Sequence, residues 1–139
     1  LYLSAIMDAY SRKIVSYSIN DNLRTDGSLD CLQKAIKKIG VPDGLIHHSD
    51  RGSQYTSHRY LKQLVDHNIQ PSFTGVGRCY DNPFIERFFR TIKHEFGLSQ
   101  IIKDKKIAMK LIHSAIDSYN KRRLHSSLNY QTPDEVYYG

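Results

Sequence analysis

The sequence predicts an α/β fold in a single compact domain that covers residues 1–139. Three observations predict it. Short apolar segments with strand-like patterns alternate with segments of helical periodicity in the first half of the chain. The second half shows helical periodicity alone. A chain of 139 residues with 40% apolar content supplies one hydrophobic core. Within this domain we expect a strand-and-helix core over residues 1–100 and a C-terminal helix with a tail over residues 101–139.

The opening of the chain predicts a β-hairpin. An apolar run from Leu1 to Met7 is followed by the turn sequence Asp8-Ala9-Tyr10-Ser11-Arg12 and by alternating residues over 14–19. The first run is apolar at successive positions, which is typical of a strand covered on both faces. We therefore expect a further strand to pair with it.

The next segments alternate between helix and strand. A helix begins at Thr25 or Asp26 and ends before Gly40 and Pro42. Strand, helix and strand follow at 45–47, 57–67 and 69–73. The residues expected on the buried faces of the two helices are Leu29, Leu32, Ile36 and Ile39, and Tyr60, Leu61, Leu64 and Val65.

The C-terminal half predicts helices over 83–96 and 104–120, then an extended tail with a short terminal helix. The residues expected on the inner faces are Ile85, Phe88, Phe89, Ile92 and Phe96 in the first helix, and Ala108, Leu111, Ile112, Ala115, Ile116 and Tyr119 in the second.

The charge of the chain is concentrated in one region. Residues 87–125 hold ten Lys or Arg and three acids, whereas the whole chain has a net charge of +6. Such a local excess is typical of a protein that binds a polyanionic partner, and the alternative is a solvated basic face.

No apolar run is long enough to cross a bilayer, and the first residues lack a secretory signal, so we expect a soluble intracellular protein. Cys31 and Cys79 lack paired spacing, which favours neither a disulfide nor a zinc site.

Two carboxylates stand where an α/β fold places functional groups. Asp50 follows a predicted strand, although an aspartate there also serves as a turn or helix-cap residue. Glu86 lies in the first turn of the 83–96 helix and shares a face with Arg90 and Lys93 at i, i+4 and i+7. This trio predicts either a metal-binding carboxylate beside phosphate-binding cations or a simple surface ion pair.

Four segments carry a family resemblance. They are the hairpin turn Asp8-Ala9-Tyr10-Ser11-Arg12-Lys13-Ile14-Val15, the segments 48–55 (HSDRGSQY) and 80–95 (YDNPFIERFFRTIKHE), and the tail motif 119–125 (YNKRRLH) with Leu128 and Thr132-Pro133. Together they resemble the insertion-sequence-three family of transposases, which belongs to the retroviral integrase superfamily. The 35 residues between Asp50 and Glu86 equal the separation of the last two members of that family's acidic signature.

The resemblance implies an RNase H-like catalytic core, with a mixed sheet flanked by helices. It implies that Asp50 and Glu86 are catalytic and bind Mg²⁺ or Mn²⁺, with two ions in the complete site. The family's first strand and first catalytic aspartate lie upstream of residue 1, so we expect a partial core that is inactive in strand transfer by itself. Asp8 matches the family's turn aspartate, which argues against a metal-ligand role.

The resemblance and the basic region together predict DNA contacts. The expected contact residues are Arg51, Asn82, Arg87, Arg90, Lys93, Lys121, Arg122, Arg123 and His125. For the cluster at 121–125, a cationic helix end that complements the helix dipole is an equally suitable explanation. Tyr80 is a candidate for stacking on a base or for packing. His47 and His48 are adjacent on a strand and must point to opposite faces, which favours supporting roles for both.

The expected function is metal-dependent DNA cleavage and strand transfer during insertion-sequence transposition in bacteria. The expected partners are the element ends and the target DNA, with a homomultimer at synapsis, and neither a membrane nor a small-molecule substrate. The expected location is the cytoplasm, in association with the nucleoid. A nuclease or resolvase of the same superfamily is one alternative, and the tail motif argues against it. A catalytically incomplete remnant or truncated piece that acts only as a basic DNA-binding or assembly module is the other.

Overall fold

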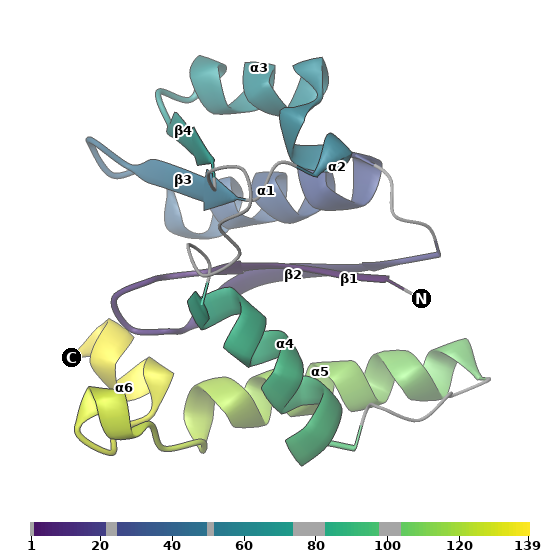
Figure 1. The fold of residues 1–139 in the computed structure, drawn as a ribbon, viewed down its shortest axis with the longest axis vertical. Helices are drawn as coiled ribbons and strands as arrows, with labels where there is room; N and C mark the ends of the chain where they lie inside the picture. Colours follow the sequence, from purple (N-terminus) through teal and green to yellow (C-terminus); the bar gives the residue numbers. More distant parts are fainter. Residues whose placement is uncertain (1, 22–24, 50–51, 74–82, 98–103) are drawn as a thin grey trace. The chain divides into compact units, whose positions relative to one another are not determined.

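The computed structural model describes residues 2–21, 25–49, 52–73, 83–97 and 104–139. The chain forms two compact units. One comprises Leu1–Ile6 and Val15–Pro83, and the other comprises Met7–Ile14 and Phe84–Gly139. Strands and helices alternate in the first unit and helices dominate the second, which confirms the predicted α/β class (Figure 1).

The predicted hairpin is present. Strands β1 (Tyr2–Met7) and β2 (Ile14–Asn20) form a two-stranded sheet. The short connection makes the pair antiparallel, because parallel neighbours need a crossover of a dozen or more residues. Among the described strands, β1 pairs with β2 alone, so the further neighbour expected for the first strand stays a prediction. β1 is half-buried, and the more deeply buried strand is β2.

Strand β2 can bury Ser16 and Ser18 because both hydroxyl groups find hydrogen-bond acceptors inside the unit. Ser16 Oγ donates to the Cys31 carbonyl oxygen at 2.8 Å, and Ser18 Oγ donates to Asp30 Oδ2 at 2.9 Å. Both acceptors lie on helix α1 (Thr25–Ile39). Small hydroxyl side chains thus let the helix lie close to the strand without leaving a buried polar group unpaired.

The core of the first unit lies between α1 and helix α3 (His58–Asp66). Its buried members are Leu29, Leu32, Tyr60, Leu64 and Ile69. Strands β3 (Ile46–Ser49) and β4 (Gln70–Phe73) pair in parallel, with Ile46 opposite Gln70 and Ser49 opposite Phe73. Figure 1 shows this pair beside the two helices.

The predicted helix over 57–67 is confirmed with Ser57 as its N-cap, whose side chain accepts a hydrogen bond from the Tyr60 amide. A separate short helix, α2 (Ser53–Thr56), precedes it. Two predicted core positions are wrong, because Ile39 is 40% exposed and Val65 is 63% exposed. Ile39 is the last residue of α1, where Gly40 adopts a φ of +73° and ends the helix.

The second unit is built from helices α4 (Pro83–Glu95) and α5 (Lys105–Lys121) and the C-terminal tail. Phe88 of α4 is fully buried and meets Tyr119 of α5 edge to face, with ring centroids 5.0 Å apart. Asp104 caps α5 by accepting from the amides of Lys106 and Ile107. Leu111, expected on the inner face, is 44% exposed, so that prediction is wrong.

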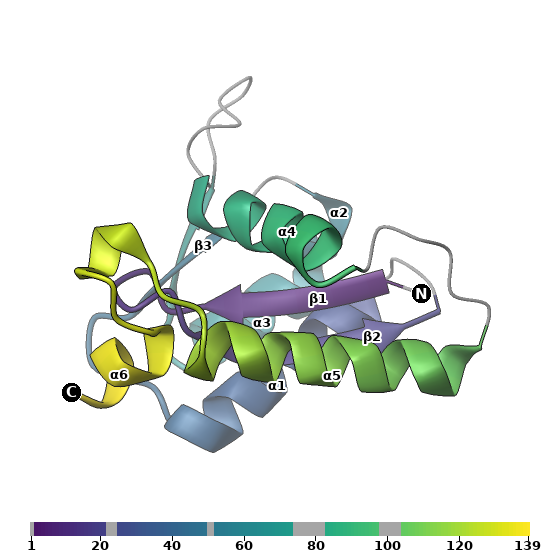
Figure 2. The same ribbon diagram turned by 90° about the horizontal axis from the view of Figure 1, so that it is seen from below.

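The tail folds back onto the second unit. A 3-10 turn (η2, Ser126–Leu128) leads to the short helix α6 (Pro133–Tyr138), as Figure 2 shows beyond the C-terminal end of α5. Thr132 and Glu135 form a capping box at the start of α6. This confirms the predicted short terminal helix.

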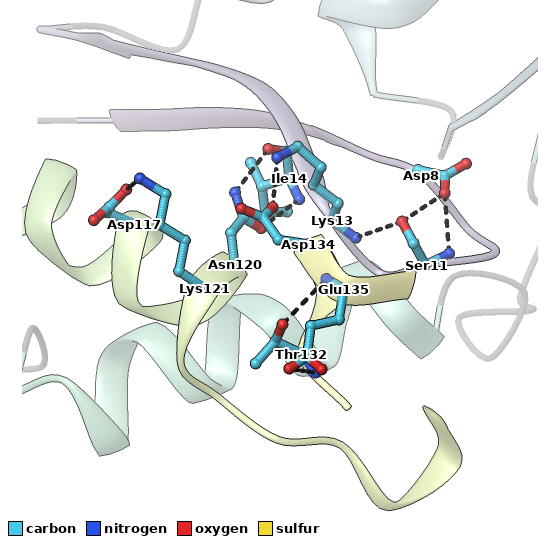
Figure 3. Close-up of polar contacts among 10 residues, drawn as sticks. All are labelled: Asp8, Ser11, Lys13, Ile14, Asp117, Asn120, Lys121, Thr132, Asp134 and Glu135. Carbon is cyan, nitrogen blue, oxygen red and sulfur yellow. Dashed lines mark hydrogen bonds and ion pairs between the residues drawn. The ribbon is translucent and has the colours of Figure 1, made fainter. Parts of the chain in front are cut away.

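Two polar contacts join the hairpin turn to the C-terminal elements of the second unit (Figure 3). The buried Lys13 ammonium lies 2.5 Å from Asp134 Oδ1 of α6. Burial opposes its charge, but the hydrogen bonds and charges of Asp134 and Tyr138 outweigh this and raise the pKa of Lys13. Asn120 of α5 bonds both backbone groups of Ile14. Among the described residues, no helix is long and apolar enough to cross a membrane.

Candidate functional site

Glu86 stands in the first turn of α4, where the sequence places it. Pro83 begins the helix, as its fixed φ and missing N–H allow. The Glu86 side chain is exposed, two residues before the fully buried Phe88. The position suits a carboxylate, because the first-turn N–H groups and the helix dipole favour negative charge.

The shared face of Glu86, Arg90 and Lys93 is exposed, and its three side chains do not pair with one another. Among the described residues, none of the three makes an ion pair. Other i,i+4 pairs in the same chain do close, namely Asp30–Lys34 at 3.0 Å, Lys62–Asp66 at 2.8 Å and Asp117–Lys121 at 2.9 Å. The alternative of a simple surface ion pair therefore does not describe α4. As far as the described residues go, the Glu86 carboxylate is free to meet a cation, and the Arg90 and Lys93 side chains are free to meet phosphate.

Arg87 is also exposed on α4, next to the trio. The remaining members of the expected site, Asp50, Arg51 and Asn82, lie outside the described residues, as does Tyr80. Of the described part of the chain, no cluster of three or more His, Cys, Asp or Glu side chains is placed to hold a metal. Of the two predicted metal ligands, Asp50 lies outside the described residues and Glu86 lies within them.

The strand that leads to residue 50 is anchored from one side by His47. Its Nε2 lies 2.9 Å from the hydroxyl of the buried Tyr60, and its ring also packs near Tyr55. Burial lowers the pKa of His47, which keeps the ring neutral. His48 is exposed and bonds Ser72 Oγ across the β3–β4 pair at 2.9 Å. The two histidines thus differ in environment, as alternation along a strand requires.

Asp8 is used by the hairpin turn. Its Oδ2 accepts hydrogen bonds from the Ser11 amide at 3.0 Å and from Ser11 Oγ at 2.6 Å (Figure 3). This local use of the carboxylate matches the role expected from its place in the turn.

The basic cluster near the end of α5 divides into different environments. Lys121 pairs with Asp117, and Arg122 is exposed at the helix C-cap. Arg123 instead forms a bidentate pair with Glu95 of α4, from Nε at 2.8 Å and from Nη2 at 2.7 Å.

His125 is only 9% exposed and stands edge-on to Tyr119, with ring centroids 5.2 Å apart. Burial, followed by the nearby positive charges of Arg123 and Arg12, lowers its pKa. The imidazole of His125 is thus enclosed and packed against Tyr119, and its predicted contact with the DNA backbone stays a prediction. Arg123 likewise ties the tail to α4.

Sequence reasoning did not single out Arg12 as a site residue. Its guanidinium Cζ lies 3.5 Å from the ring centroid of Phe84, two residues before Glu86. The sequence showed an arginine in the hairpin turn, but no periodicity connects residue 12 with residue 84.

Family models identify the kind of domain to which the chain belongs. An integrase core domain model matches residues 1–79, and a second model of the same description matches residues 67–133. The transposase for insertion sequence element IS904 of Lactococcus lactis is 37% identical over 136 residues, which cover 97% of this chain and 54% of that protein. Transposase InsF for insertion sequence IS3A of Escherichia coli is 32% identical, with coverage of 97% and 47%. The chain therefore spans about half the length of these curated relatives.

Solved structures show the same fold. The catalytic core domain of HTLV-2 integrase, solved in complex with magnesium in a trimeric form, has a TM-score of 0.70 at 16% identity, with coverage of 94% of this chain and 80% of that one. The catalytic core of BIV integrase has a TM-score of 0.73 at 21% identity, with coverage of 98% and 84%. The chain has the RNase H-like fold of these cores, and it belongs to the integrase core domain family.

Proposed function

We propose that this chain contributes to metal-dependent DNA cleavage and strand transfer in the transposition of an insertion sequence. The observation that carries the proposal is the exposed face of Glu86, Arg90 and Lys93 on α4, which forms no ion pair with any residue that the structure describes, in a member of the integrase core domain family. Its curated relatives are named as transposases of insertion sequences, which favours this reaction over cutting alone.

Asp50 and Glu86 are the proposed metal ligands. Mg²⁺ and Mn²⁺ prefer carboxylate oxygens, so the exposed Glu86 side chain suits the group. A pair of such ions, when bound, activates the attacking oxygen and stabilises the leaving oxygen in a displacement at phosphorus. The HTLV-2 integrase core, which shares the fold, was solved with magnesium, and this supports the choice of ion.

The proposed DNA partners are the element ends and the target. The proposed backbone contacts are Arg87, Arg90 and Lys93 on α4, Arg51 and Asn82 beside the carboxylates, and Lys121 and Arg122 at the end of α5. The proposal assigns Arg123 and His125 to support, because one is paired with Glu95 and the other is buried. The HTLV-2 core occurs in trimeric and dimeric forms, which supports a multimer during synapsis.

A non-catalytic DNA-binding or assembly module is the second candidate. The excess of ten Lys or Arg over three acids at 87–125 favours it equally, since charge alone binds DNA. The two candidates differ in what Glu86 does. A binding module gains nothing from a free carboxylate beside its phosphate contacts, whereas a metal-dependent centre requires it.

Metal binding by this chain separates the two candidates. Mn²⁺ binding is measured by electron paramagnetic resonance for the wild type and for Asp50→Asn, Glu86→Gln and the control Asp66→Asn. Asp66 is an exposed carboxylate on α3 that pairs with Lys62. We expect weaker binding by both site variants and no change in the control. Equal Mn²⁺ affinity in the wild type and Glu86→Gln contradicts the proposal.

DNA binding tests the cationic face. Lys93→Ala is expected to weaken binding to duplex DNA and to reduce the slope of log affinity against log salt by about one, because one phosphate contact releases about one counterion. Fluorescence anisotropy at several salt concentrations measures both quantities. Lys62→Ala, on the first unit, is the matched control. An unchanged slope in Lys93→Ala contradicts the phosphate contact.

A further inference from the structure

We propose that Arg12 is a positioning residue for Glu86. It stacks on Phe84 and thereby holds the first turn of α4 in place. The role assigned to Glu86 rests on the proposed function, whereas the contact between Arg12 and Phe84 does not. All three residues belong to the same compact unit.

The hairpin turn holds Arg12 in an uncommon backbone conformation. Arg12 has a φ of +67°, a region that residues other than glycine seldom adopt. Its amide donates to the Asp8 carbonyl oxygen at 2.8 Å. The Asp8 carboxylate in turn accepts two bonds from the fully buried Ser11. Such conformations persist only where the surroundings enforce them, and they concentrate at functional sites.

This backbone directs the guanidinium back across its own turn. Arg12 Nη1 donates to the Ala9 carbonyl oxygen and, at 3.3 Å, to the Tyr10 carbonyl oxygen. The carbonyl oxygens of the turn therefore hold the guanidinium of Arg12 in place. Its Cζ lies 3.5 Å from the Phe84 ring centroid, well within the range of a cation–π interaction.

Glu86 stands between two anchored rings. Phe88, on its C-terminal side, is fully buried against Tyr119. Phe84, on its N-terminal side, is 45% exposed, and Arg12 is the cation stacked on it. The first N–H groups of a helix lack intrahelical acceptors, so this turn opens most readily. A contact at Phe84 stabilises the turn that carries the carboxylate.

A direct phosphate contact by Arg12 would have different consequences. Lysine preserves the charge and supports a point contact to phosphate, but it lacks the planar group that stacks on a ring. Arg12→Lys therefore separates positioning from phosphate binding. Phe84→Leu removes the same stack from the other side and leaves the hairpin turn intact. Phe84→Trp keeps an aromatic face.

The test measures amide hydrogen exchange of residues 86–89 by NMR in the intact chain, together with Mn²⁺ affinity. Arg12→Lys and Phe84→Leu are each expected to speed exchange about two- to five-fold and to weaken Mn²⁺ binding by a similar factor. Phe84→Trp should stay near the wild type. The double variant should change no more than either single variant, because both remove one contact. Arg59→Lys on α3 is the control, since its pair with Asp26 is exposed.

Unchanged exchange in both Arg12→Lys and Phe84→Leu overturns the proposal. A smaller salt slope for DNA binding in Arg12→Gln, with unchanged exchange, also overturns it and assigns Arg12 to phosphate. A third outcome combines faster exchange in Arg12→Lys and Phe84→Leu with equal Mn²⁺ affinity in the wild type and Glu86→Gln. That outcome supports the Arg12 contact and contradicts the proposed function. The two failures are therefore distinguishable.

Discussion

Asn120 offers the sharpest test of how the second unit is held together. Its Oδ1 accepts from the Ile14 amide at 2.9 Å, and its Nδ2 donates to the Ile14 carbonyl oxygen at 3.0 Å (Figure 3). The side chain thus satisfies both backbone groups of one residue, as a neighbouring strand would. Asn120 is 8% exposed and Ile14 is 3% exposed, so water has little access to these groups.

Asn120→Ala leaves a donor and an acceptor buried without partners. Each unsatisfied group costs about 1–3 kcal/mol, and partial relaxation brings the expected total to about 3 kcal/mol. For a chain of 139 residues this corresponds to a fall of roughly 10 °C in Tm. Urea and thermal unfolding, followed by circular dichroism, measure both values. Asp117→Ala on the exposed side of α5 is the control and should have little effect.

Asn120→Asp adds a pH dependence with a defined sign. An aspartate here keeps the acceptor for the Ile14 amide but turns a carboxylate oxygen toward the Ile14 carbonyl oxygen. Burial and this repulsion raise its folded-state pKa above the unfolded value of about 3.9. Its favourable contribution is then present below the unfolded pKa and is lost as the pH rises through the folded pKa. The loss of stability relative to wild type should be smaller at pH 4 than at pH 7. A loss below about 1 kcal/mol in Asn120→Ala, or the opposite pH trend in Asn120→Asp, refutes this reasoning.

Three further predictions concern other parts of the chain. Leu64→Ala should lower the free energy of unfolding by about 2–5 kcal/mol in urea titrations, because Leu64 is 1% exposed in the first core. Burial raises the pKa of Cys31 to about 11, so in a Cys79→Ser background its thiol should react with Ellman's reagent at pH 8 only after unfolding. Hydrogen bonds from Arg123 lower the pKa of Glu95, so the stabilisation is present above the unfolded pKa and lost as the pH falls. Glu95→Gln should therefore destabilise at pH 7 by less than about 1 kcal/mol, and by less still at pH 3, in unfolding titrations.

The elements themselves follow from local sequence. The hairpin, the helix that ends at Ile39 and the helix that begins at Pro83 were predicted within a residue or two of their observed bounds. Capping residues, helix breakers and apolar periodicity act over a few neighbours, so they can be recognised without the fold. The place of Glu86 in the first turn of α4 was predictable for the same reason.

Tertiary structure decided which predicted faces are buried. Ile39, Val65 and Leu111 fit an apolar stripe by spacing, but each is at least 40% exposed. Periodicity gives the angle of a residue around its helix and not the width of the surface that covers it. Conversely, the serines of β2 are polar and yet buried, because α1 supplies hydrogen-bond acceptors for both of their hydroxyl groups.

By itself, the sequence determined the order of the elements, the family, the basic region and the helix that presents Glu86. Only the tertiary structure decided that Glu86 and Arg90 find no ion-pair partner among the described residues, that Arg123 pairs with Glu95 and that Arg12 stacks on Phe84. The physical reason is the separation along the chain of the residues that interact. A helical cap or stripe depends on residues within a few positions, whereas a charge 28 or more positions away acts on its partner only where folding brings the two together.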